Sequence, residues 1–244
     1  MENVEVLWFD LGYTLVKQDR ERHMRQYLYT NGYDVSHEFL EKAYHLADKK
    51  FMRKRHEYGE IFSIEFYKKY LSNLVKYLEI KLPPEKLIDC VLEKGKGKSS
   101  EWHCFEYTHE TLGRLKNEGY ILGLLSNWDE NGRNIIKINE LDKYFKYIII
   151  SSELGFEKPD KKIFEYALNL CKREAEKCLY IGDNFYDDVI GSSKVGMNSI
   201  LINRFGSFGI EEIDHFVISG INELPEILKR KISIEHYQIN RYEV

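Results

Sequence analysis

An aspartate that follows a buried strand is suited either to hold a metal ion or to act as a nucleophile. Asp10 is such a residue, because it follows the apolar run at 4–9 and opens the turn at 10–15. A carboxylate at the carboxyl end of a buried strand is costly to desolvate, so a chain that places one there usually uses it. Metal binding and nucleophilic attack are the two chemistries that fit.

Three later segments carry the partners that this carboxylate would need. Ser126-Asn127 ends a predicted strand, Lys158-Pro159-Asp160 opens a predicted helix, and Gly182-Asp183-Asn184 ends another strand, with Asp188 following. Alone, each segment fits a plainer role, since Asp and Ser-Asn are common in turns, single lysines are mostly solvated, and acids are favoured at helix starts. Their joint placement favours a shared site.

Short apolar strands that alternate with amphipathic helices are expected to position these residues. Strands are predicted at 4–9, 120–126, 147–151, 178–182 and 199–202, and helices at 105–117 and 161–171. This alternation predicts an α/β fold with a three-layer, Rossmann-like parallel sheet core. Ligands of open parallel sheets bind at the carboxyl ends of strands, where Asp10, Ser126 and Asp183 are placed.

Residues 16–103 interrupt the alternation with four predicted helices, at 20–30, 36–55, 63–78 and 84–94. Ser36 and the Pro83-Pro84-Glu85 segment are plausible helix starts. We therefore expect two domains, a core of residues 1–15 and 104–244 and an inserted all-helical domain of residues 16–103. The last stretch, 232–244, has no clear assignment.

Composition limits the classes of function. The chain has 244 residues, of which 43% are hydrophobic and 31% charged, as expected of a packed globular protein. A net charge of −4 gives no support to nucleic-acid binding, and the apolar runs are too short to cross a bilayer. The four cysteines lack CxxC spacing, which favours reduced thiols in a cytoplasmic protein. Monomer and homodimer both remain open.

Taken together, the motifs resemble those of the haloacid dehalogenase-like hydrolase superfamily, in its subclass with an α-helical cap. The residues that carry the resemblance are Asp10 with Thr14, Ser126 with Asn127, Lys158 with Pro159 and Asp160, and Gly182-Asp183-Asn184 with Asp188, Gly191 and Gly196. It covers nearly the whole chain. It implies a Mg²⁺-dependent phosphatase that acts on a small phosphorylated metabolite, with the helical insert as its cap.

The resemblance also implies how phosphate would be handled. Asp10 would attack phosphorus and form an aspartyl-phosphate, which divides a difficult hydrolysis into two steps. Lys158 would place a cation against both the nucleophile and the transferring group. Ser126 and Asn127, with nearby backbone N–H groups, would bind the phosphoryl oxygens.

The Mg²⁺ ligands implied by the resemblance are the side chains of Asp10 and Asp183 and the carbonyl of Gly12. Asp188 would be a ligand through water or would orient Lys158. Asp187 could exchange roles with Asp188, but the spacing of Asp188 to the following glycine fits the family pattern better.

Gly12 departs from that pattern. Phosphatases of the family usually have a second Asp two residues after the nucleophile, which protonates the leaving oxygen and then activates water. General acid–base help of this kind is worth about 10²–10⁴-fold. Some sugar-phosphate phosphatases of the superfamily also have Gly there, so catalysis is not excluded. The cap could lend a proton donor, the substrate could have a good leaving group such as an acyl phosphate, or turnover could be slow.

Two further hypotheses stay open. Dehalogenases of the same superfamily attack carbon with an Asp but need no metal, and they typically lack the full acidic fourth motif, so Asp183 with Asp188 argues against that activity. The other hypothesis is a regulatory protein that binds phosphate without rapid turnover, with Gly12 as the mark of lost catalysis.

Overall fold

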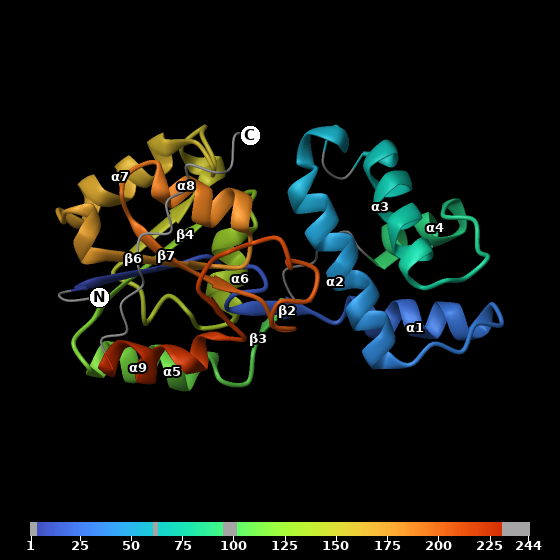
Figure 1. The fold of residues 1–244 in the computed structure, drawn as a ribbon, viewed down its shortest axis with the longest axis horizontal. Helices are drawn as coiled ribbons and strands as arrows, with labels where there is room; N and C mark the ends of the chain where they lie inside the picture. The colour runs from blue at the N-terminus through green and yellow to red at the C-terminus, as the bar shows by residue number, and fades with distance from the viewer. Residues whose placement is uncertain (1–3, 61–62, 95–101, 231–244) are drawn as a thin grey trace. The chain divides into compact units, whose positions relative to one another are not determined.

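The computed structural model describes residues 4–60, 63–94 and 102–230, and the chain divides into two compact units. One unit comprises residues 1–17 and 102–244, and the other comprises residues 18–101. Figure 1 shows the elements of both units. The stretch 232–244, for which the sequence gives no assignment, lies outside the described residues.

The first unit is built on a six-stranded sheet in the order β5-β4-β1-β6-β7-β8, in which neighbouring strands are parallel. The five longer strands lie where the sequence predicts them, because each is a nearly continuous apolar run, as is typical of strands buried on both faces. The sixth strand, β8, has only two residues and was not predicted. The bounds are β1 Val6–Phe9, β4 Ile121–Ser126, β5 Tyr147–Ile150, β6 Cys178–Gly182, β7 Asn198–Ile202 and β8 Val217–Ile218.

Helices cover both faces of this sheet, which confirms the predicted three-layer α/β fold (Figure 1). Alternate residues of β1 point to opposite faces: Leu7 and Phe9 pack with α5, α6 and α9, whereas Val6 and Trp8 pack with α7. The helices are α5 Thr108–Asn117, α6 Gly132–Ile138, α7 Lys161–Cys171, α8 Ile190–Ser193 and α9 Leu224–Lys229, with the short turns η3 Ser151–Glu153, η4 Ala175–Lys177, η5 Phe185–Val189 and η6 Ile221–Glu223.

The second unit is helical and has a hydrophobic core of its own, which includes Leu40, Leu71 and Leu74. Ser36 caps its second helix by accepting a hydrogen bond from Phe39 N at 3.2 Å, as the sequence predicts for that helix start. The elements are α1 Arg20–Thr30, α2 His37–Arg53, η1 Arg55–Glu57, α3 Ile64–Tyr77 and α4 Glu85–Lys94.

Residues at both ends of the segment that the sequence assigned to an all-helical insert are strands. β2 (Val16–Gln18) and β3 (Trp102–Cys104) form a separate two-stranded sheet. Each has three residues, too few for a recognisable alternation of apolar and polar side chains.

Among the helices that the structure describes, none has the length and apolar content that a membrane span requires. All four cysteines are free thiols.

Candidate active site

The sheet register brings three polar strand ends to one edge. Phe9 of β1 is level with Leu124 of β4 and with Ile181 of β6. Asp10 therefore emerges between Ser126, the last residue of β4, and Asp183, the first residue after β6. The chain builds β4 and β5 on one side of β1 and then crosses to β6 on the other side, so this edge is the switch point at which open α/β sheets bind ligands.

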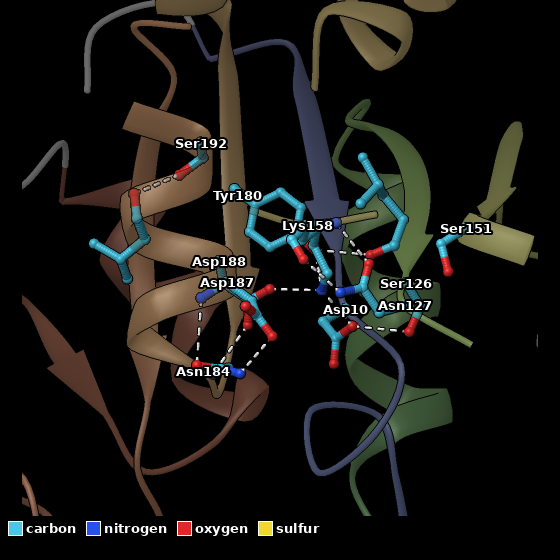
Figure 2. A network of polar contacts seen from close by, with 12 residues as sticks. Asp10, Ser126, Asn127, Ser151, Lys158, Tyr180, Asn184, Asp187, Asp188 and Ser192 are labelled. Atoms are coloured by element: carbon cyan, nitrogen blue, oxygen red, sulfur yellow. Dashed lines mark hydrogen bonds and ion pairs between the residues drawn. The ribbon is translucent and has the colours of Figure 1, made fainter. Parts of the chain in front are cut away.

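Lys158 lies at the centre of a buried polar network (Figure 2). Its ammonium donates to Asp10 Oδ1 at 2.8 Å, to Asp188 Oδ1 at 2.6 Å and to Tyr180 Oη at 3.0 Å. An ammonium has three N–H donors, so each donor has one partner. Burial alone would lower the pKa of Lys158, but the charges of Asp10 and Asp188 outweigh it and raise this pKa well above its ordinary value. Lys158 is therefore a permanent cation.

The two oxygens of Asp10 differ in their surroundings. Oδ1 accepts hydrogen bonds from the Ser126 hydroxyl at 2.9 Å and from Lys158. Oδ2 accepts none from the residues that the structure describes. The carboxylate is thus fixed through one oxygen, while the other keeps its lone pairs for an ion or an electrophile.

Asn127 fixes the backbone of Lys158. Its side-chain oxygen accepts from Lys158 N, and its side-chain nitrogen donates to Lys158 O, both at 2.8 Å. Both polar groups of this amide are therefore bonded within the protein. The sequence assigns Asn127 to phosphate, which stays a prediction; its side-chain amide positions the backbone of Lys158.

A π-helical turn, η5, presents Asp188 to the site. Asn184 begins the turn: its side chain accepts from Tyr186 N and Asp187 N and donates to Asp187 Oδ2 at 2.7 Å. The other acid, Asp188, accepts from Asn184 N at 2.9 Å and turns its second oxygen to Lys158. Both acids therefore bond to Asn184, but only Asp188 also reaches Lys158.

Three carboxylates gather as a metal site requires. Asp10, Asp183 and Asp188 each offer one oxygen, and these oxygens lie within 4.8 Å of one another. An all-oxygen, anionic donor set suits a hard divalent cation such as Mg²⁺. Lys158 pairs with Asp10 and Asp188, and the oxygen donors present fit the ion that the sequence predicts.

Burial and neighbouring charges change the pKa values of the acids in this site. Burial raises the pKa of Asp188 above its ordinary value, although Lys158 acts in the opposite direction. Burial, together with the charge of Asp188, raises the pKa of Asp187 to about 7. Because the acids outnumber the single lysine, a divalent cation would favour their charged forms.

Two indoles occupy the space beside Gly12. A Cβ atom on Gly12 would lie 3.1 Å from Trp128 Cζ3 and 3.8 Å from Trp102 Cη2. The two rings meet edge to face, with centroids 4.8 Å apart, and Tyr13 packs on Trp102 at 5.6 Å. Ser151 accepts from the backbone N–H of Trp128 at 3.1 Å, which anchors that residue. A side chain at residue 12 would therefore require Trp128 to shift by a few tenths of an ångström.

Because Gly182 has no side chain, Asp188 can approach the end of β6 closely, and a larger residue at position 182 would disturb the site. A Cβ atom on Gly182 would lie 2.1 Å from Asp188 Oδ2. We expect Gly182→Ala to displace that carboxylate, to lower the free energy of unfolding by about 1–3 kcal/mol and to lower activity. Thermal unfolding and activity assays measure the two effects. Gly155→Ala, at an open position with φ of 75°, is a control for the strain of replacing a glycine; equal activity losses in both variants would contradict the role of Gly182.

Sequence reasoning brought together five residues that the structure places in one cluster, and it missed others. The five are Asp10, Ser126, Lys158, Asp183 and Asp188. It did not identify Tyr180 as the third partner of Lys158, nor Trp128 and Trp102 as neighbours of Gly12. A hydroxyl inside an otherwise apolar strand was the available signal for Tyr180, because a buried hydroxyl needs a hydrogen-bond partner.

Comparisons with known proteins agree with this geometry. The family model of the haloacid dehalogenase-like hydrolases matches residues 9–202. A protein of Pyrococcus furiosus named glyceraldehyde 3-phosphate phosphatase is 26% identical over 243 residues, which cover 95% of each chain. A protein of Burkholderia cepacia named (S)-2-haloacid dehalogenase 4A is 30% identical over 128 residues, which cover 51% of this chain and 54% of the relative.

The fold has solved counterparts. The crystal structure of a HAD-hydrolase from Bacillus subtilis, YfnB, aligns with a TM-score of 0.61 over 93% of this chain and 100% of its own length, at 20% identity. At 20% identity the alignment shows a shared fold only. The family match spans both Asp10 and Asp188, and the chain belongs to the haloacid dehalogenase-like hydrolases.

Proposed function

We propose that this hydrolase is a Mg²⁺-dependent phosphatase that acts on a small phosphorylated metabolite through Asp10. One observation carries the proposal: Asp10 is held through Oδ1 by Ser126 and Lys158, while its other oxygen accepts no hydrogen bond from the described residues. The names of relatives such as the Pyrococcus furiosus phosphatase support the phosphatase class.

The reaction would proceed in two displacements at phosphorus. In the first, an Asp10 oxygen bonds to phosphorus, and the bond to the leaving oxygen breaks with its electron pair, which then takes up a proton. In the second, water attacks the aspartyl-phosphate, inorganic phosphate leaves, and the carboxylate is restored. Lys158, a fixed cation, offsets the negative charge that gathers on the phosphoryl oxygens in both steps.

The ion would be held by Asp10, Asp183, the Gly12 carbonyl and Asp188, the last directly or through water. When bound, Mg²⁺ supplies Lewis-acid stabilisation of the phosphoryl charge and aligns the transferring group. Asp188 also orients Lys158 at 2.6 Å, so it has a role in either arrangement. Asp187 is bonded to Asn184 and is the weaker candidate for the ion.

The helical unit is proposed to be the cap that selects the substrate. It is inserted between β1 and β4, the two strands that supply Asp10 and Ser126. An insert at that point of the chain can respond to a ligand at the strand ends, as lids do in many enzymes. Cytoplasmic location and a monomeric or homodimeric state remain predictions.

Dehalogenation is the second candidate, favoured by the name of the Burkholderia cepacia relative. That chemistry needs no cation, whereas Asp183 and Asp188 gather beside Asp10 as cation ligands do. Chloride release from a 2-haloacid in the presence of EDTA would favour it over phosphate transfer. A regulatory phosphate-binding role predicts binding of inorganic phosphate with no multiple turnover.

Metal removal tests the proposal directly. A panel of phosphorylated metabolites, scored by released phosphate, is expected to contain at least one substrate turned over many times with Mg²⁺. Treatment with EDTA should abolish release, because Lys158 alone cannot neutralise three carboxylates and a phosphoryl group. Added Mg²⁺ should restore it. Turnover that persists in EDTA would contradict the metal role, and no turnover of any phosphate would contradict the function.

A further inference from the structure

Tyr180 is a buried tyrosine whose hydroxyl joins two parts of the site. It is the middle residue of β6, is 0% exposed, and its ring meets Phe164 of α7 edge-on at a centroid distance of 5.4 Å. Its hydroxyl donates to the carbonyl of Leu125 on β4 at 2.7 Å and accepts from Lys158 at 3.0 Å (Figure 2). These two bonds satisfy the donor and an acceptor site of the buried hydroxyl, and one of them ends on the lysine of the site.

The chemistry of the two partners fixes the direction of both bonds. A carbonyl can only accept and an ammonium can only donate, so the single phenol proton is committed to Leu125. The phenol oxygen is then left to accept from Lys158. Burial raises the pKa of Tyr180 well above its ordinary value, so the phenol stays neutral and keeps both roles.

Tyr180 differs from the other two partners of Lys158, because it is neutral and is proposed neither to react nor to hold the ion. Asp10 would exchange its negative charge for a bond to phosphorus, and Asp188 lies in the carboxylate cluster that is proposed to hold the ion. We propose that Tyr180 is a positioning residue that holds the Lys158 ammonium in place while the charge on Asp10 changes. This inference rests on the proposed function of Asp10 as nucleophile.

Tyr180→Phe tests the inference, because phenylalanine keeps the ring and its contact with Phe164 but removes the oxygen. We expect kcat to fall about 10- to 100-fold, with KM changed less than about threefold, since a displaced cation weakens the transition state more than ground-state binding. Tyr147→Phe is the matched control. Tyr147 packs against the same cluster and stacks on Trp8 at 5.9 Å, so its kcat should stay within about twofold.

A double-mutant cycle separates positioning from a general effect on folding. If Tyr180 acts through Lys158, then Tyr180→Phe should cost less than about twofold in a Lys158→Met background. A loss of equal size in both backgrounds would overturn the inference, as would an unchanged kcat in the single variant.

The lysine itself gives a readout that needs no turnover. In ¹⁵N-labelled wild-type protein, a buried ammonium with three fixed acceptors is expected to give an observable proton signal. In Tyr180→Phe its exchange with solvent should be at least about tenfold faster, because one donor has lost its acceptor. Unchanged exchange would overturn the inference even if the Lys158→Met variant fails to fold. If the wild-type protein hydrolyses no phosphate ester, the proposed function is contradicted. The exchange rate of the Lys158 ammonium protons would still test whether Tyr180 positions Lys158.

Discussion

Asp10→Asn is expected to abolish phosphate release while the protein stays folded. An amide is a very poor nucleophile, so turnover should fall at least about 10³-fold on any substrate that the wild type accepts. The amide oxygen can still accept from Ser126 and Lys158, which keeps the hydrogen bonds of Oδ1. Released phosphate is the measurement, and substantial turnover by the variant would contradict the nucleophile role.

The stability of the same variant gives an independent prediction. The carboxylate oxygens of Asp10, Asp183 and Asp188 lie close together, and Lys158 pairs with Asp10 and Asp188, so removing one negative charge relieves repulsion in this site. In EDTA the variant should therefore unfold at a temperature no lower than that of the wild type. Added Mg²⁺ should raise the unfolding temperature of the wild type more than that of the variant, because a ligand stabilises in proportion to its affinity for the folded state.

Asp160→Asn is the matched control for both measurements. Asp160 caps α7 by accepting from Lys162 N at 3.0 Å, and its side chain is exposed. Asn caps helices about as well as Asp, so activity should stay within about twofold and the unfolding temperature should hardly move. A large activity loss in this control would mean that the assay responds to charge near Lys158 rather than to the nucleophile.

The parts of the fold that could be predicted are the segments in which burial of apolar side chains sets the pattern over many residues. β4 and β6 are mostly apolar and fully or nearly fully buried, and α7 repeats its buried residues at helical spacing. In a parallel sheet the position of a polar residue follows once the strand end is known, so the gathering of Asp10, Ser126 and Asp183 needed no knowledge of side-chain contacts.

The parts that could not be predicted depend on contacts between distant segments. The spacing to the following glycine favoured Asp188 over Asp187, but the π-helical turn η5 that presents Asp188 to Lys158 was not predicted. Tyr180 fits a buried strand as an ordinary aromatic residue until Lys158 is placed beside it. The β2–β3 pair has too few residues for a pattern, and it includes Trp102, which lies beside Gly12.

The indoles change what should be expected of restoring an acid at position 12. Gly12 is outside the left-handed region, so its backbone accepts a side chain, but the Cβ atom would lie 3.1 Å from Trp128. We therefore expect Gly12→Asp alone to gain little activity, because the indole stands in the way of the new side chain and must shift to admit it. Gly12→Asp with Trp128→Ala removes that block.

In the double variant, turnover of an alkyl phosphate should rise about 10²–10⁴-fold relative to Trp128→Ala alone, which is the value of a general acid. An acyl phosphate should gain much less, because its leaving carboxylate needs no proton. The measurement is kcat/KM for one substrate of each kind in the wild type, both single variants and the double variant. A full gain in Gly12→Asp alone would show that Trp128 yields, which contradicts the steric argument. No gain in the double variant would mean that another group already supplies the proton.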